Sequence, residues 1–290
     1  AAKIPCLGIE PAQNIARVAR EKGIETRADF FGRSLAEELA DNGRQADLIL
    51  GNNVFAHAPD TNDFVAGLER LLKPGGRIVL EFPYAVDFVT GCEFDTIYHE
   101  HVFYFSLTAL EPLFRRHGLE LFRAERLSIH GGSLRLFAGR TGAQPVHDSI
   151  AALLAEELAG GFNTLTPYET MASRAQAIRE ELCALVRSLK REGHSIAAYG
   201  ASAKGSTLLN YCGLGAEELD FIADRSTAKI GRLSPGRHLP IVNADELARR
   251  NPSHTLLLTW NFADEILAQQ AAYRNAGGRF ILPIPDVRIL

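Results

Sequence analysis

Short apolar runs alternate with amphipathic segments along the first part of the chain. Residues 4–10, 47–53 and 77–83 read as strands, and the run at 47–53 has the composition of a buried one. Between these runs, residues 12–23 and 64–72 carry apolar side chains at helical spacing. Strands separated by helices of this length are typical of right-handed βαβ units, so the pattern predicts a parallel sheet.

Capping signals predict where two of these helices begin and end. Ser34 and Glu37 have the S-x-x-E spacing of a capping box, and Asn42-Gly43 should end that helix. Ser106 should cap a later helix that ends at Gly118. Both helices are thus bounded by local sequence alone.

The strand signals change after this second helix. Residues 120–129 and 133–140 both read as strands, and only His130-Gly131-Gly132 lies between them. Strands joined this closely must be antiparallel, so the first sheet should end in a hairpin. Residues 141–148 (TGAQPVHD) then form the best linker in the chain.

Strand and helix patterns alternate again beyond a long helical stretch at 148–191. The strand patterns lie at 194–200, 218–224, 254–260 and 279–285, and the helical ones at 206–212, 244–250 and 262–275. This predicts a second, smaller α/β domain, so we expect domains at 1–140 and 141–290.

Composition narrows the class of protein. The 290 residues are 46% hydrophobic and 23% charged, which suits two globular domains. The net charge is −4 and no block of basic residues occurs, so nothing in the charge pattern indicates nucleic-acid binding. No apolar run approaches membrane-spanning length, no secretory signal is readable, and the four cysteines form no CxxC pair. We therefore expect a reduced cytoplasmic protein, a monomer, without membrane contact.

Polar residues at strand ends are the first candidates for chemistry, because open α/β sheets bind ligands there. Glu10 could accept the hydroxyls of a ribose, or it could be a solvated strand-end acid. The glycine loop GASAKG (200–205) is followed by Ser206 where a P-loop has lysine, which argues against an ATPase. With Lys204 the loop could cradle a diphosphate, or it could only be a tight turn.

The stretch FDTIYHEHVFYFS (94–106) crowds polar residues among aromatics. If it is extended, His99 and His101 share one face, while Tyr98 and Glu100 share the other. A metal would need further ligands that no spacing supplies. An acid–base site needs only one tuned histidine and a polar partner. A purely structural role could explain any one of these residues. It explains all four poorly, because buried polar groups cost free energy unless they are paired.

Several motifs together resemble a known family. LLKPGGRIVLEFP and LGIEP are similar to class I S-adenosylmethionine-dependent methyltransferases, which have a Rossmann-like sheet. NNVFAH, EFPY, FDTIYHEHVFYFS, HGGSLR and GASAKG resemble, more narrowly, the sugar C-methyltransferases that act on carbon 3 of nucleotide-linked keto-deoxysugars. The resemblance runs from about residue 4 to the end of the chain.

The resemblance implies roles for particular residues. His101 would be the general base, with Tyr98, Glu100 and His57 in the same site. The residues implied to hold S-adenosylmethionine are Glu10, Asp29 and Phe30, and we expect Asn52, which follows a strand, to join them. The strand-end positions select Tyr84, Tyr199, Lys204 and Asp224, and with His99 we expect them to contact the nucleotide-sugar, with dTDP the expected nucleotide. The second domain would close over this substrate.

The chain also departs from the family pattern. Members begin with a cysteine-rich zinc-binding region, followed by a strand and a glycine-rich cofactor loop of the form E-I-G-S-N-D-G. The 290 residues contain neither pattern, so we expect the first sheet to be incomplete at its N-terminus. A nucleotide-sugar isomerase or epimerase, a non-catalytic nucleotide-sugar binding module and a metal enzyme using His99 and His101 stay open as alternatives.

Overall fold

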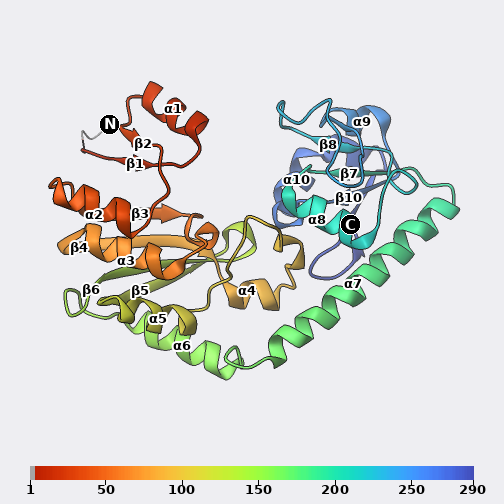
Figure 1. Cartoon of the computed structure of the whole chain (residues 1–290). Coiled ribbons are helices and arrows are strands. Elements are labelled where there is room, and N and C mark those ends of the chain that lie inside the picture. Colours follow the sequence, from red (N-terminus) through yellow and green to blue (C-terminus); the bar gives the residue numbers. More distant parts are fainter. Residues whose placement is uncertain (1–3) are drawn as a thin grey trace. The chain divides into compact units, whose positions relative to one another are not determined.

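The chain folds into two compact units in a computed structural model that describes residues 4–290, apart from the side chain of His130 (Figure 1). Unit 1 combines the residues up to Tyr84 with Val102–Ser128 and Ser133–Asn163. Unit 2 combines Ala85–His101, Ile129–Gly132 and Thr164–Leu290. Each unit is thus built from three segments, and the boundary at 140/141 stays a prediction about domains.

Unit 1 begins with a small parallel pair of strands. β1 (Gly8–Ile9) pairs with β2 (Thr26–Arg27), and α1 (Gln13–Glu21) connects them. The strand predicted at 4–10 is therefore in the right place but pairs over two residues only.

A separate four-stranded sheet forms the centre of unit 1. Its order is β3 (Ala46–Asn52), β4 (Leu72–Pro83), β6 (Ser133–Arg140) and β5 (Leu119–Leu127). β3 and β4 are parallel, while β6 is antiparallel to both β4 and β5. The predicted parallel unit and the predicted hairpin are both confirmed, but the single first sheet is divided into two pieces.

The prediction that residues 47–53 are a buried strand is only half right. β3 forms, but Leu48 is 53% exposed and Leu50 is 66% exposed. The reason is its place in the sheet: within residues 4–290, β3 pairs with β4 alone and has an open outer edge. Apolar composition cannot report whether a strand will have a neighbour on both sides.

Helices cover the sheets of unit 1. They are α2 (Arg33–Asp41), α3 (Thr61–Leu71), α5 (Leu107–Arg116) and α6 (Asp148–Ala159). The cap at Ser106 is confirmed, since its hydroxyl accepts from the backbone N–H of Ala109. The Ser34 capping box is wrong. The N-cap residue is Gly32, two positions before Ser34, and α2 begins at Arg33, whose backbone N–H donates to Asp63 on α3.

The core of unit 1 is aromatic beside the short helix η1 (Phe55–His57). Phe55 stacks on Phe105 with ring centroids 4.5 Å apart, and Phe82 and Phe114 meet Phe55 edge-on. This packing anchors η1, and His57 extends from its end as an exposed side chain.

Unit 2 contains a six-stranded sheet, which confirms the predicted second α/β domain. Its order is β12 (Arg288–Ile289), β11 (Arg279–Leu282), β10 (His254–Leu257), β7 (Ile196–Tyr199), β8 (Ile222–Asp224) and β9 (Ile241–Asn243). All pairs are parallel except β11 with β12. The strand order reverses between β7 and β10, which is where open α/β sheets form a ligand crevice.

The helices of unit 2 come from distant parts of the sequence. They are α4 (Ala85–Thr90), α7 (Thr166–Arg191), α8 (Ala203–Cys212), α9 (Glu246–Arg250), α10 (Ala263–Gln269) and α11 (Ala271–Asn275). The short helices are η2 (Phe94–Thr96), η3 (Ile129–Gly131) and η4 (Trp260–Phe262). In the part of the chain described, no helix is both long enough and apolar enough to cross a membrane.

Candidate active site

The segment that carries the two histidines is a turn, not a strand. η2 ends at Thr96, and the backbone N–H of His101 donates to the carbonyl oxygen of Tyr98 over 3.0 Å. The extended interpretation, with His99 and His101 on one strand face, is therefore wrong. The turn instead folds His101 back toward η2.

His101 is held by both of its ring nitrogens. Nδ1 lies 3.0 Å from the carbonyl oxygen of Thr96, and Nε2 lies 3.3 Å from the hydroxyl oxygen of Tyr98. A carbonyl oxygen can only accept, so Nδ1 carries the proton of the neutral ring. Nε2 then has a lone pair that accepts from the Tyr98 hydroxyl. This is the tautomer a general base needs, with a donor beside the basic nitrogen.

Two buried carboxyl groups lie in the residues just before the histidine turn. Glu93 is 4% exposed and Asp95 is fully buried. Burial raises the pKa of Glu93 to about 7 and that of Asp95 to about 6, against the opposing effect of the Lys204 charge in both cases. Hydrogen bonding from Trp260 also opposes the shift at Asp95. Both carboxyls therefore titrate near neutral pH, a property that clusters at functional sites.

The glycines of HGGSLR make room for this acidic region. Gly131 and Gly132 have positive φ values of 96° and 143°. A Cβ on Gly131 would lie 2.2 Å from a carboxylate oxygen of Glu93, and one on Gly132 would lie 2.3 Å from the Cβ of Asp87. Only glycine fits at either position, which explains in physical terms why this motif accompanies the histidine turn.

The GASAKG loop connects β7 to α8 as the sequence predicts. Gly200 has a φ of 93°, and a Cβ on Gly205 would lie 2.7 Å from Leu258, so both glycines serve a close turn and close helix packing. The Ser202 hydroxyl accepts from the N–H of Gly205 and caps α8. Lys204 is therefore the residue of the loop whose side chain could contact a ligand. Its ammonium lies 4.9 Å from the centre of the Trp260 ring.

Three predicted substrate residues already form hydrogen bonds through their side chains within their own units. Tyr84 is fully buried and donates its hydroxyl to Glu157 over 2.7 Å. Tyr199 is 4% exposed and accepts from Gln270. Asp224 accepts from the backbone N–H groups of Ala201 and Ser226, which organise the glycine loop. The geometry gives these three side chains structural partners.

The predicted cofactor residues follow the strand ends of unit 1. Glu10 follows β1 and accepts from the backbone N–H of Ala12 through one oxygen. Phe30, beyond β2, is 81% exposed, and Asn52, the last residue of β3, is also exposed. Such a carboxylate and such an aromatic ring fit a ribose and an adenine.

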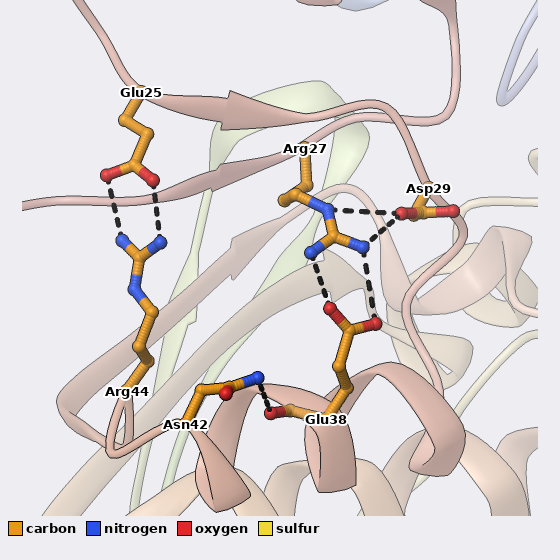
Figure 2. A network of polar contacts seen from close by, with 6 residues as sticks. All are labelled: Glu25, Arg27, Asp29, Glu38, Asn42 and Arg44. Carbon is orange, nitrogen blue, oxygen red and sulfur yellow. Dashed lines mark hydrogen bonds and ion pairs between the residues drawn. The ribbon is translucent and has the colours of Figure 1, made fainter.

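Asp29 belongs to an ion-pair network that joins β2 to α2 (Figure 2). Arg27 contacts Asp29 over 3.0 Å and Glu38 over 2.8 Å, and its pKa is raised chiefly by the hydrogen bond to Glu38. Arg44 forms a two-pronged pair with Glu25 in the same figure. One carboxylate oxygen of Asp29, Oδ2, therefore already accepts hydrogen bonds from Arg27.

The structure also adds residues that sequence reasoning missed. Glu93, Asp95 and Trp260 join Lys204 near the histidine turn. The sequence assigned no role to any of these three, although Asp95 lies within the FDTIYHEHVFYFS stretch. One signal was readable: Asp95 directly follows Phe94 in a stretch rich in aromatic residues, and a carboxylate buried among aromatic residues needs a partner. Its partner, Trp260, lies 165 positions away and could not be read from spacing.

The remaining histidine-turn residues are at the surface. His99 and Glu100 are exposed, whereas Tyr98 and His101 are half-buried with ring centroids 4.3 Å apart. Among the residues the structure describes, no three His, Cys, Asp or Glu side chains gather in a way that could hold a metal ion.

The fold is that of an α/β protein, and its second unit carries a turn that holds His101 through both ring nitrogens. Comparisons with known proteins give its family. A family model described as "C-methyltransferase C-terminal domain" matches residues 128–285, and one described as "Methyltransferase domain" matches residues 2–124. The C-methyltransferase NovU of Streptomyces niveus is 39% identical over 285 residues, which are 98% of this chain and 68% of NovU. The chain belongs to the C-methyltransferase family.

More distant relatives share only part of the chain. The ubiquinone biosynthesis O-methyltransferase of Bartonella bacilliformis is 29% identical over 75 residues, 26% of this chain and 30% of that protein. A solved SAM-dependent methyltransferase from Thermotoga maritima is 18% identical, covering 46% of this chain and 72% of its own, with a TM-score of 0.37. The family assignment rests on the sequence comparisons.

Proposed function

We propose that this C-methyltransferase transfers a methyl group from S-adenosylmethionine to carbon 3 of a nucleotide-linked 4-keto-deoxysugar, with dTDP as the expected nucleotide. The observation that carries the proposal is His101. Its Nδ1 proton is committed to the Thr96 carbonyl oxygen, so Nε2 is left basic beside the Tyr98 hydroxyl. The family membership and the sugar-methyltransferase motifs support the substrate class.

Carbon methylation needs a carbon nucleophile, and a 4-keto sugar can supply one. The proton on C3 is acidic because it is alpha to the carbonyl group. His101 Nε2 would take that proton, and the electron pair of the C–H bond would delocalise onto the C4 oxygen as an enolate. Tyr98, whose hydroxyl already lies at Nε2, would donate to the substrate as the proton arrives on the ring. His57 and Glu100 stay in this proposal as supporting groups.

Unit 1 offers residues that fit the adenosine part of the cofactor. Glu10 keeps a second carboxylate oxygen for the ribose, and Phe30 presents an exposed ring for the adenine. Asn52 and Asp29 would complete this set. When bound, S-adenosylmethionine supplies the electrophilic methyl group.

On unit 2, Lys204 is the residue best suited to the nucleotide. It stands in the first turn of α8, directly after the glycine loop, where its charge would favour a diphosphate. His99 is exposed and stays a proposed sugar contact. Tyr84, Tyr199 and Asp224 would act through the shape of the site, since their polar groups already have partners. Cytoplasmic location and a monomeric state remain predictions.

Calorimetry with S-adenosylhomocysteine and with dTDP, titrated separately, tests the proposal. We expect both to bind, with Glu10→Ala weakening only the first and Lys204→Ala only the second. Each variant should lose about 1.5–3 kcal/mol of binding free energy, the range for a hydrogen bond to a charged group. Binding of dTDP alone would overturn methyl transfer by this chain and favour an isomerase or a binding module. Binding of neither would overturn the substrate class as well.

A further inference from the structure

A continuous series of contacts links the glycine loop of unit 2 to the histidine turn. The Lys204 ammonium lies over the Trp260 ring, and the Trp260 Nε1–H donates to Oδ2 of Asp95 over 2.7 Å. Asp95 is the central residue of η2, and η2 ends at Thr96, whose carbonyl oxygen accepts from His101. All of these residues belong to unit 2.

We propose that Asp95 and Trp260 are positioning residues for His101: their hydrogen bond fixes η2 so that the Thr96 carbonyl oxygen meets Nδ1 and selects the tautomer with a basic Nε2. The catalytic role of His101 rests on the proposed function. The positioning itself rests only on the contacts within unit 2.

The burial of Asp95 explains why this bond matters. The residue has no exposed surface, and its Oδ1 has no hydrogen-bond partner among the described residues. Among the described residues, the Trp260 N–H is the one side-chain donor to Asp95, and a buried carboxylate that loses such a donor is strongly disfavoured. Without that donor, Asp95 would have to turn toward another donor or toward water, and η2 would turn with it.

Other contacts restrict how η2 can respond. The Thr96 hydroxyl donates to the Glu93 carbonyl oxygen over 2.8 Å, which closes the η2 turn on itself. The Phe94 ring packs against Tyr211 of α8, with centroids 5.1 Å apart. η2 therefore moves as a unit, and a rotation at Asp95 displaces the Thr96 carbonyl that holds the imidazole.

The ring nitrogens of His101 report this positioning directly. We would record long-range proton–nitrogen correlations on ¹⁵N-labelled protein at pH 8, and assign His101 by its loss in His101→Asn. Wild type should show the Nδ1–H tautomer. Trp260→Phe, which keeps a ring but removes the donor, and Asp95→Ala should both give mixed tautomers, seen as convergence of the two nitrogen shifts.

Two further variants make the test specific. Asp95→Asn keeps a side-chain oxygen that can accept from Trp260, so it should retain the wild-type tautomer. Tyr211→Phe removes a hydroxyl outside the series of contacts and should also leave His101 unchanged. Unchanged nitrogen shifts in a folded Trp260→Phe protein would overturn the proposal, and that variant decides alone if Asp95→Ala does not fold.

Catalysis provides the second measurement. With dTDP-4-keto-6-deoxyglucose in deuterium oxide, Trp260→Phe should slow exchange at C3 roughly 10- to 100-fold, the effect of a misplaced catalytic group, with little change in KM. If wild type shows the expected tautomer and its response to Trp260→Phe but no C3 exchange, the proposed function fails and the positioning stands. If C3 exchange occurs but the His101 tautomer is the same in Trp260→Phe as in wild type, the positioning proposal fails and the proposed function stands.

Discussion

At the scale of single residues, the site depends on a few polar groups whose partners are backbone atoms or distant side chains. Sequence reasoning predicted a site at His101 and Tyr98 because the YHEH pattern resembles a known family. It could not show that the Thr96 carbonyl fixes the ring, because that contact depends on a turn, whereas an extended segment was considered. Tyr84 illustrates a related limit of local patterns: a polar residue after a strand suggests a ligand contact, and spacing does not reveal that its hydroxyl donates to Glu157, 73 positions away.

Glu93 provides a residue-scale prediction about stability and pH. Its folded-state pKa of about 7 lies above the ordinary value of 4.5 because burial disfavours the charged form. The carboxyl therefore stays neutral up to about pH 7 in the folded protein, whereas it ionises above about pH 4.5 in the unfolded chain. Its contribution to stability is complete below about pH 4.5 and is lost as pH rises from there through 7. Glu93→Gln stays neutral, so its unfolding free energy should exceed that of wild type by about 3 kcal/mol at pH 8 and by little at pH 4.

Urea denaturation at the two pH values measures this difference. Glu217→Gln is the matched control, because Glu217 is an exposed glutamate of the same unit. A constant difference between Glu93→Gln and wild type from pH 4 to pH 8 would show that Glu93 is not a strained buried acid.

At the scale of elements, local signals located most helices and strands, and contacts between elements decided their ends. Ser106 caps α5 as expected, since that interaction spans three residues. The start of α2 was misjudged because Asp63, 30 positions away, satisfies its first backbone N–H. The predicted buried strand at 47–53 became an edge strand for the same reason: pairing partners are a property of the whole sheet.

The junction of α5 and α6 gives an element-scale prediction. The fully buried Glu157 of α6 accepts from the backbone N–H groups of Leu107 and Thr108, at 2.6 and 2.8 Å, and from the Tyr84 hydroxyl. Glu157→Ala should lower the unfolding free energy by about 3 kcal/mol, because buried donors lose their acceptor. Tyr84→Phe should cost about 1 kcal/mol, since it removes one bond of the three.

Chemical denaturation and steady-state kinetics together check this assignment. Glu156→Ala removes only an exposed ion pair with Arg126, so it should cost no more than about 1 kcal/mol. Tyr84→Phe should leave KM for the nucleotide-sugar unchanged. A tenfold rise in KM without a loss of stability would instead make Tyr84 a substrate contact.

At the scale of the whole molecule, the sequence predicted two α/β parts and the structure contains two, but each is assembled from three segments. The histidine turn illustrates the difference. It precedes the hairpin of unit 1 in sequence, yet it belongs to the unit that carries β7, α8 and Trp260. Linker composition reveals where a chain can be divided, whereas membership of a unit depends on packing between segments far apart in sequence.

The central claim is that His101 removes the C3 proton of a nucleotide-linked 4-keto sugar. The most direct measurement is solvent-deuterium exchange at C3 of dTDP-4-keto-6-deoxyglucose, followed by proton NMR in the absence of a methyl donor. The proton on C5, also alpha to the carbonyl, serves as an internal control. Wild type should catalyse exchange at C3, and His101→Asn should abolish it while still binding dTDP. Exchange at the wild-type rate in His101→Asn would contradict the claim.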